Sequence, residues 1–179
     1  MPVFSLPSKY GIGCFSKEAY KFVDQLKKAG QSYWQILPLG PTGYGDSPYQ
    51  SFSTYAGNPY FIDLKTLVKE GLLTKKECKE VRCKILKKAY RRFQKNDKYE
   101  KFLEENAFWL EDYCMYMAIK DAHEGKSWSE WEELLKKREK IALEKVKEEL
   151  EDEIGFYQFQ QYEFDRQWKK LHTYAKEQG

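Results

Sequence analysis

The sequence has 179 residues, of which 31 are basic and 28 are acidic, so its formal net charge is only +3. This near balance gives no basis for binding nucleic acid or an anionic membrane, since both favour a strongly basic surface. No charged-then-apolar leader opens the sequence, and no apolar run approaches the roughly 20 residues of a membrane span. We therefore expect a cytoplasmic protein.

The cysteines form no framework for a disulfide or a metal site. Metal ligation needs convergent side chains at suitable spacing, and only His123 and His172 are available as imidazole ligands. We expect reduced thiols, no metal and no cofactor; the four cysteines are Cys14, Cys78, Cys83 and Cys114.

The first 39 residues predict a strand, a helix and a second strand. Residues 3–6 are expected to form a short strand. Ser16 is expected to cap a helix with apolar residues at helical spacing, and Gly30 is expected to end it. The apolar run at residues 33–39 suits a strand buried on both faces. This order predicts a βαβ unit, in which the two strands are parallel.

A long loop is predicted after residue 39, and Asp46 is its only charged residue as far as Tyr60. Loops of this length are usually functional or disordered, and the many tyrosines argue against disorder. One interpretation is a sugar site, in which aromatic rings stack on pyranose faces and polar groups bind the hydroxyls. The other is a structural loop whose tyrosines only pack beneath it. Composition alone leaves both open.

Beyond residue 64 the sequence becomes highly charged and is predicted to be helical. Thr74 and Glu77 have the spacing of a capping box, which predicts a helix that runs to about Phe93. A second helix is predicted over residues 99–123, where apolar side chains on nearly every face indicate burial among other helices.

Two further helices are predicted after Gly125. Ser129 and Glu132 have the spacing of another capping box. From about residue 139 to residue 178 the helical pattern is unbroken, and Gly155 is the expected bend. The aromatic second half of this segment is expected to be buried.

Several motifs together resemble one known family. LPLGPTGYGDSPYQSFS at residues 37–53 and AGNPYFIDL at residues 56–64 are similar to the amino-terminal signature of the 4-α-glucanotransferases. These are the amylomaltases, or disproportionating enzymes, of glycoside hydrolase family seventy-seven. Four further segments fit the same pattern: SLPSKYGIG at 5–13, YWQILPLG at 33–40, ENAFWLEDYCMYMAIK at 105–120, and the FxxQWxxL run at 164–171.

The resemblance implies an α/β fold: the N-terminal portion of a (β/α)8 TIM barrel with a mostly helical inserted subdomain. Residues 1–64 are then the start of the barrel with a sugar-binding loop, and residues 65–179 are the helical subdomain. The implied activity is retaining transfer of α-1,4-glucan segments between malto-oligosaccharides. A whole barrel needs about 250 residues, so we expect a fragment of such an enzyme that is inactive alone.

The resemblance also implies a set of substrate-binding residues. It places a sugar-stacking tyrosine at Tyr49, with Ser47 and Asp46 nearby, and matches Tyr44 to a tyrosine of a secondary glucan site. Asp46 has a second interpretation as a turn residue bonded to its own backbone. No catalytic residue is predicted here, because the family's catalytic carboxylates belong to later barrel strands.

The residues themselves lead to the same view of catalysis. A retaining mechanism needs two carboxyl groups about 5–5.5 Å apart, and the loop supplies only Asp46. Asp63 lies in FIDL, where we expect it to cap or to terminate a strand.

One departure from the family is that residues 73–85 are shorter than the corresponding segment of relatives, which puts glucan contacts there in doubt. The alternative reading is a stand-alone helical interaction or carbohydrate-binding module without enzymatic activity.

Overall fold

The computed structural model describes residues 1–179, except for the side chain of Tyr44. The chain divides into two compact units. Unit 1 comprises Met1–Gln94 and Gln160–Gly179, and unit 2 comprises Lys95–Phe159. Among the described residues, no helix is long and apolar enough to cross a membrane.

Unit 1 is built around the C-terminal half of the long helix α7, Glu151–Gln178. Its other helices are α1, Lys17–Lys28, α2, Leu64–Lys69, and α3, Arg82–Arg92. Short 3-10 helices lie between them: η1 at Val3–Ser5, η2 at Tyr44–Asp46, η3 at Pro59–Phe61 and η4 at Glu77–Lys79.

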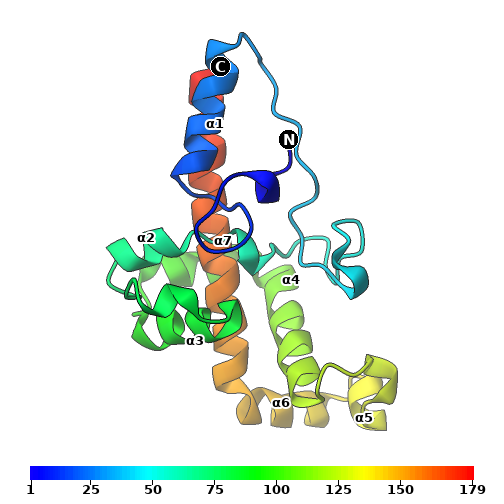
Figure 1. Cartoon of the computed structure of the whole chain (residues 1–179). Coiled ribbons are helices and arrows are strands. Elements are labelled where there is room, and N and C mark those ends of the chain that lie inside the picture. The colour runs from blue at the N-terminus through cyan, green and yellow to red at the C-terminus, as the bar shows by residue number, and fades with distance from the viewer. The chain divides into compact units, whose positions relative to one another are not determined.

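Helix α1 begins as the sequence predicts, because the Ser16 side chain accepts a hydrogen bond from the backbone N–H of Glu18 at 3.3 Å. It runs beside the C-terminal half of α7 (Figure 1). The Tyr174 hydroxyl donates to Asp24, and the Tyr20 and Tyr174 rings lie 5.0 Å apart. The expected helix and its Ser16 cap are therefore confirmed, and the structure adds that the helix packs on α7.

The two expected parallel strands are absent, which corrects the predicted βαβ unit. Residues 3–5 form η1, and residues 33–39 carry no regular secondary structure. Across the chain as described, the only β-pairing is an isolated antiparallel bridge between Thr42 and Ser51. An apolar run becomes a strand only where a neighbour pairs its N–H and C=O groups. No β-bridge among the described residues includes this run, and Tyr33 is 92% exposed.

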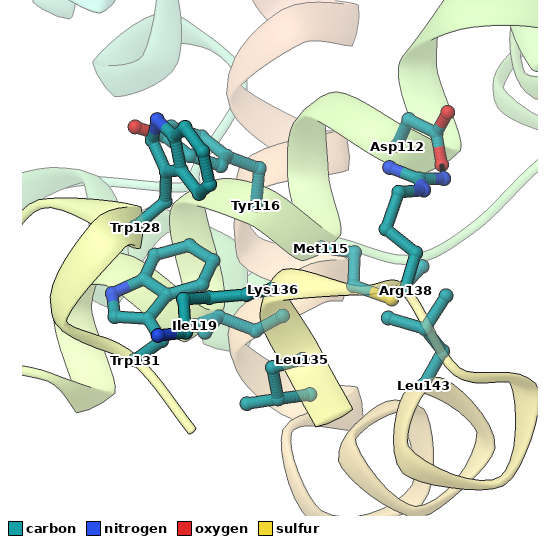
Figure 2. A pocket seen from close by; sticks show the side chains of 10 residues that line it. All are labelled: Asp112, Met115, Tyr116, Ile119, Trp128, Trp131, Leu135, Lys136, Arg138 and Leu143. Atoms are coloured by element: carbon teal, nitrogen blue, oxygen red, sulfur yellow. Dashed lines mark hydrogen bonds and ion pairs between the residues drawn. The ribbon is translucent and has the colours of Figure 1, made fainter. Parts of the chain in front are cut away.

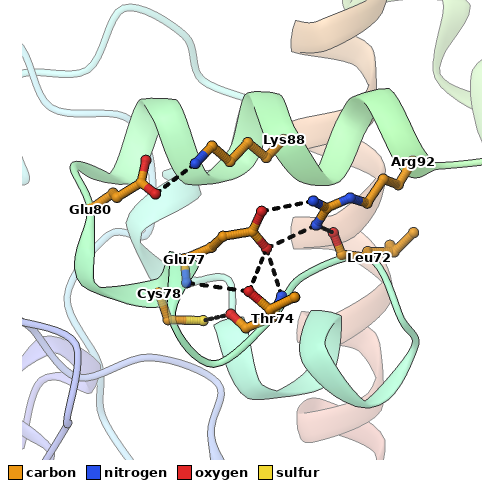
Figure 3. Close-up of polar contacts among 7 residues, drawn as sticks. All are labelled: Leu72, Thr74, Glu77, Cys78, Glu80, Lys88 and Arg92. Atoms are coloured by element: carbon orange, nitrogen blue, oxygen red, sulfur yellow. Dashed lines mark hydrogen bonds and ion pairs between the residues drawn. The ribbon is translucent and has the colours of Figure 1, made fainter.

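Thr74 and Glu77 form the reciprocal bonds of a capping box, but these bonds close the turn before η4 and do not start the long helix that follows. The N-cap of η4 is Lys76, which makes no side-chain cap hydrogen bond. Helix α3 begins five residues after Glu77, at Arg82. Figure 3 shows that Glu77 also reaches Arg92 at the far end of α3, with Nη2–Oε1 and Nη1–Oε2 distances of 2.7 and 2.9 Å. The Thr74–Glu77 turn is therefore attached to the end of α3 through Arg92.

Unit 2 contains α4, Asp97–Ala122, η5, Trp128–Glu130, α5, Glu133–Lys136, α6, Lys140–Glu149, and the start of α7. Helix α4 buries residues along its length, as its all-round apolar pattern predicts. Tyr157 on α7 donates a hydrogen bond of 2.6 Å to Asp121 on α4. Lys147 on α6 forms an ion pair with Glu111 on α4.

Two predicted details of this unit are wrong. The capping box after Gly125 consists of Ser127 and Glu130, not of Ser129 and Glu132. The long C-terminal segment breaks at Leu150, with φ −113° and ψ 26°, while Gly155 lies inside α7. Three consecutive acidic residues begin α7, and negative charge favours a helix start. This electrostatic preference favours a helix start at Glu151, so the segment breaks at Leu150, five residues before Gly155.

Candidate functional site

The loop at residues 40–58, called the site loop below, has a fixed backbone. Its two ends are joined because the Asn58 N–H donates to the Leu39 carbonyl at 2.8 Å. Further in, the Gly43 N–H donates to the Gln50 carbonyl at 2.9 Å, next to the Thr42–Ser51 bridge. The loop is therefore ordered, as its aromatic content predicts.

The tip of the site loop turns through two residues with positive φ. Gly45 has φ 76°, which suits a residue without a Cβ atom, and Asp46 has φ 52°. The Asp46 carboxylate accepts a hydrogen bond of 3.2 Å from the Thr42 hydroxyl. Asp46 therefore lies in a turn, as one interpretation expected, but its carboxylate is bonded to the Thr42 side chain and not to its own backbone. The residue is exposed, so the carboxylate stays accessible to a ligand.

Tyr49 projects from the same tip and is 73% exposed. The Ser47 hydroxyl accepts a hydrogen bond of 3.4 Å from the Tyr49 N–H, and the Gln50 N–H donates to the Ser47 carbonyl at 3.1 Å. These bonds fix the backbone that carries the ring. The side chain of Tyr44, the fourth predicted site residue, lies outside the described part of the structure.

A pocket of about 410 Å³ lies against the site loop. The loop contributes Thr42, Asp46 and Pro48 to its wall, while Ser47 and Tyr49 are not among the lining residues. The polar groups of the wall thus sit between apolar surfaces, which is the usual composition of a small-ligand site. The two end residues of the loop, Gly40 and Asn58, also line the pocket, and the lining residues outside the loop are Phe4, Ile12, Pro38, Tyr60 and Phe61.

The pocket and its loop occur in a chain that matches a known family throughout. A sequence profile described as 4-alpha-glucanotransferase matches residues 1–179. The chain belongs to this glucanotransferase family.

The relatives agree on the family and are longer than this chain. A 4-alpha-glucanotransferase of Clostridium butyricum is 46% identical over 198 residues, covering 100% of this chain and 41% of that protein. One of Thermus thermophilus is 43% identical, covering 98% of this chain and 39% of that protein. The solved amylomaltase from Streptococcus agalactiae in complex with acarbose matches with a TM-score of 0.95 and 37% identity, over 100% of this chain and 40% of that one. This chain therefore spans about two fifths of the length of these relatives.

Helix α7 holds the C-terminal end of the glucanotransferase site loop through residues that sequence reasoning missed. The Gln161 side chain binds both backbone groups of Gly57, accepting from its N–H at 2.8 Å and donating to its carbonyl at 3.0 Å. A Cβ atom on Gly57 would lie 2.1 Å from the Phe164 ring. The sequence did contain one signal for this contact: Gln161 is a polar residue within an aromatic segment that was expected to be buried.

Tyr60 enters the pocket from η3 and is held by Arg82. The guanidinium donates to the carbonyls of Tyr60 and Ile62, both at 3.0 Å, and lies 5.7 Å from the centre of the Tyr60 ring. Arg82 is only 8% exposed, and its burial lowers the pKa of the guanidinium. Tyr60 is 49% exposed and is an aromatic wall that was not among the predicted site residues.

The acidic groups of unit 1 do not form a catalytic pair at this pocket. Asp46 is the one acidic residue among those that line it. The Asp63 carboxylate caps α2, accepting from the N–H groups of Lys65 and Thr66 at 3.3 and 3.2 Å. Asp63 therefore has a capping role, at the start of a helix, and does not terminate a strand.

The buried thiol next to Asp63 is not a nucleophile at neutral pH. Burial, and then the nearby Asp63 carboxylate, raise the pKa of Cys14 to about 11. Among the described residues, no group of three or more histidine, cysteine or acidic side chains could hold a metal ion.

Unit 2 has a second pocket of about 180 Å³ (Figure 2). Trp128 and Trp131 lie on one side of it, and Asp112 and Arg138 face each other on the other side, with an Nη2–Oδ1 distance of 2.6 Å. Its floor includes Ile119. Because its charged groups are already paired, this pocket is less suited to a polyhydroxylated ligand than the pocket at the site loop.

Proposed function

We propose that this chain is the N-terminal part of a 4-α-glucanotransferase that transfers α-1,4-glucan segments between malto-oligosaccharides in the cytoplasm. Membership of the family over residues 1–179 carries this proposal. The likeness to an amylomaltase solved with acarbose, at 37% identity, supports a saccharide ligand. The chain contributes a substrate-binding loop, and the enzyme needs no cofactor.

Tyr49 is the proposed stacking platform for a glucose unit. A ring that is 73% exposed on a fixed backbone presents an apolar face without a large entropic cost on binding. Ser47 and Asp46 beside it supply a hydroxyl and a carboxylate for the sugar hydroxyls. Tyr44, on the same tip, is proposed to bind a further part of the glucan.

The catalytic carboxylates are proposed to lie outside this chain. Retention requires a nucleophile and an acid/base about 5–5.5 Å apart. Asp46 has no acidic neighbour among the lining residues, and Asp63 is 6% exposed and engaged as a cap. Substrate binding is thus the contribution that this chain makes to the reaction.

The proposed architecture is a (β/α)8 barrel, in which residues 1–64 form the start and residues 65–179 form an inserted helical subdomain. The unpaired apolar run at residues 33–39 fits a barrel strand whose neighbours come from another part of the enzyme. In such a barrel the site loop follows the C-terminal end of a strand, where barrel enzymes place their active sites.

Replacing Tyr49 tests this proposal in the complete enzyme that carries this chain. Loss of one stacking platform costs about 1–3 kcal/mol in other binding grooves, so Tyr49→Ala should lower kcat/KM on maltotriose about 5- to 150-fold. Tyr49→Phe keeps the ring and should stay near the wild-type value. Tyr55→Ala, another exposed tyrosine of the site loop, is the matched control. An unchanged kcat/KM for Tyr49→Ala would show that the role assigned to Tyr49 is wrong.

A further inference from the structure

We infer that Gln161 is a positioning residue for the site loop: its amide fixes the peptide at Gly57 and so sets how the loop presents Tyr49 and Asp46 to a glucan. The inference rests on the proposed function of the loop. It assigns to α7 a part in substrate binding, although no α7 residue lines the pocket.

The Gln161 side chain pairs with both polar backbone groups of the buried residue Gly57. Gln161 is 2% exposed, and its two amide atoms take both the N–H and the C=O of Gly57, at 2.8 and 3.0 Å. A buried peptide that loses both partners pays the full desolvation penalty of its polar groups. An amide side chain is the one type that supplies both a donor and an acceptor in this geometry.

The surroundings leave Gly57 no second position. The Phe164 ring, one helical turn after Gln161, occupies the space in which a Cβ atom of Gly57 would lie. The next residue, Asn58, bonds to Leu39 and so joins the two ends of the site loop. A shift of the Gly57 peptide would therefore move the closure point from which the loop projects.

Gln167 provides an internal comparison on the same helix. It is 6% exposed, accepts from the Asp63 N–H at 2.7 Å, and donates to Glu163 at 3.2 Å. Its backbone target is the N-cap of α2, outside the site loop. Gln161 and Gln167 thus both accept from a backbone N–H at similar burial, but only Gln161 binds a residue of the site loop.

Hydrogen exchange separates the two roles without any ligand. Gln161→Met keeps the side-chain length and removes both hydrogen bonds, and it should speed exchange at Gly57, Asn58 and the rest of the site loop about tenfold. Gln167→Met should speed exchange at Asp63 and the start of α2 while leaving the site loop within about twofold of wild type. Gln161→Glu keeps the acceptor for the Gly57 N–H and should fall between wild type and Gln161→Met. Equal acceleration of the loop by both methionine variants would overturn the inference, because it would mean general loosening of α7.

Kinetics of the complete enzyme then connect loop position to glucan binding. Gln161→Met should raise KM for maltotriose at least about fivefold and change kcat less, since the catalytic groups are proposed to lie elsewhere. Gln161→Glu should give a KM between those of the wild type and Gln161→Met. Gln167→Met should leave KM unchanged. A mobile loop with unchanged KM overturns the inference if Tyr49→Ala still impairs kcat/KM. If Tyr49→Ala is also without effect, the proposed function of the loop is what fails, and the exchange result still supports Gln161 as its anchor.

Discussion

Gly57 lies between a helix and a loop, where the backbone has no room for a side chain. Its hydrogen bonds go to Gln161, and the Phe164 ring fills the space next to its Cα atom. A single methyl group added here would overlap the Phe164 ring. A rigid ring cannot move aside as the end of a flexible side chain could. The conformation of the site loop therefore depends on this residue having no side chain.

Gly57→Ala should destabilise unit 1 for this reason. Overpacking in a filled interior usually costs about 1–3 kcal/mol, which should appear as a lower urea midpoint with an unchanged slope. The double variant Gly57→Ala/Phe164→Leu should recover part of the loss, because the smaller side chain makes room. An urea midpoint equal to wild type in the single variant would contradict the packing described here.

His123 is a residue whose charge is coupled to the stability of unit 2. Its Nε2 lies 2.9 Å from Glu132, and its Nδ1 lies 2.8 Å from the Ile119 carbonyl. Both partners are acceptors, so the two hydrogen bonds form together only when both ring nitrogens carry protons. The hydrogen bond to Glu132, and then the one to the Ile119 carbonyl, raise the pKa of His123.

A raised pKa gives a definite direction of pH dependence. The protonated form is favoured in the folded state, so the stabilisation is complete below the unfolded pKa of about 6.5 and is lost as the pH rises through the folded pKa. We expect hydrogen exchange in the last turns of α4 to be faster at pH 8.5 than at pH 6, after correction for intrinsic rates. Glu132→Gln should weaken this difference; an equal pH response in the variant would disprove the coupling.

At the scale of elements, a short polar network fixes the turn between α2 and α3 (Figure 3). Glu77 accepts from the Thr74 N–H and hydroxyl at 2.7 and 2.8 Å, and it pairs with Arg92 through both carboxylate oxygens. Arg92 also donates to the Leu72 carbonyl at 3.1 Å. One carboxylate thus ties the start of η4 to the last turn of α3.

The Glu77 network predicts a loss of stability in acid. The hydrogen bonds from Arg92, and then those from Thr74, hold the pKa of Glu77 well below its usual range. Its stabilisation is therefore present above the unfolded pKa of about 4.3 and is lost as the pH falls through the folded value. Glu77→Gln should lower Tm at pH 7 more than at pH 3. A Tm difference independent of pH would show that charge has no part in this turn.

Helix α7 is the element that organises unit 1. Gln161, Phe164 and Gln167 follow one another at three-residue spacing, and all three contact residues between Gly57 and Asp63. Arg166 reaches α2, with two Nη–Oε distances of 2.7 Å to Glu70. The site loop and α2 are therefore both held by one helix from the end of the chain.

For the whole molecule, we predict that residues 1–179 alone transfer no glucan. The pocket at the site loop has Asp46 without a second carboxyl group, so no covalent glycosyl intermediate can form there. Incubation of the purified chain with maltotriose should yield neither glucose nor longer maltodextrins above a buffer control. Robust transfer that survives mutation of Asp46 and Asp63 would overturn this account of catalysis; activity lost on mutating Asp46 would instead make that residue catalytic.

The sequence alone determined what depends on neighbours a few residues away. The Ser16 cap, the Asp63 cap and the turn at Asp46 follow from local hydrogen bonding and backbone sterics. The apolar pattern of residues 99–123 likewise predicts the burial that α4 shows. The motif at residues 37–53 also indicated the family, because the residues of this loop are contiguous in the sequence and can be recognised without the fold.

Only the tertiary structure decided which residues hold the loop in place. Gln161 and Gly57 are 104 residues apart, so no local pattern could pair them. The expected strand at residues 33–39 failed for the same physical reason: an apolar run specifies burial, but a strand exists only when a distant backbone pairs with it. Within the described chain that partner is absent, and α7 takes over the anchoring of the loop that the run leads into.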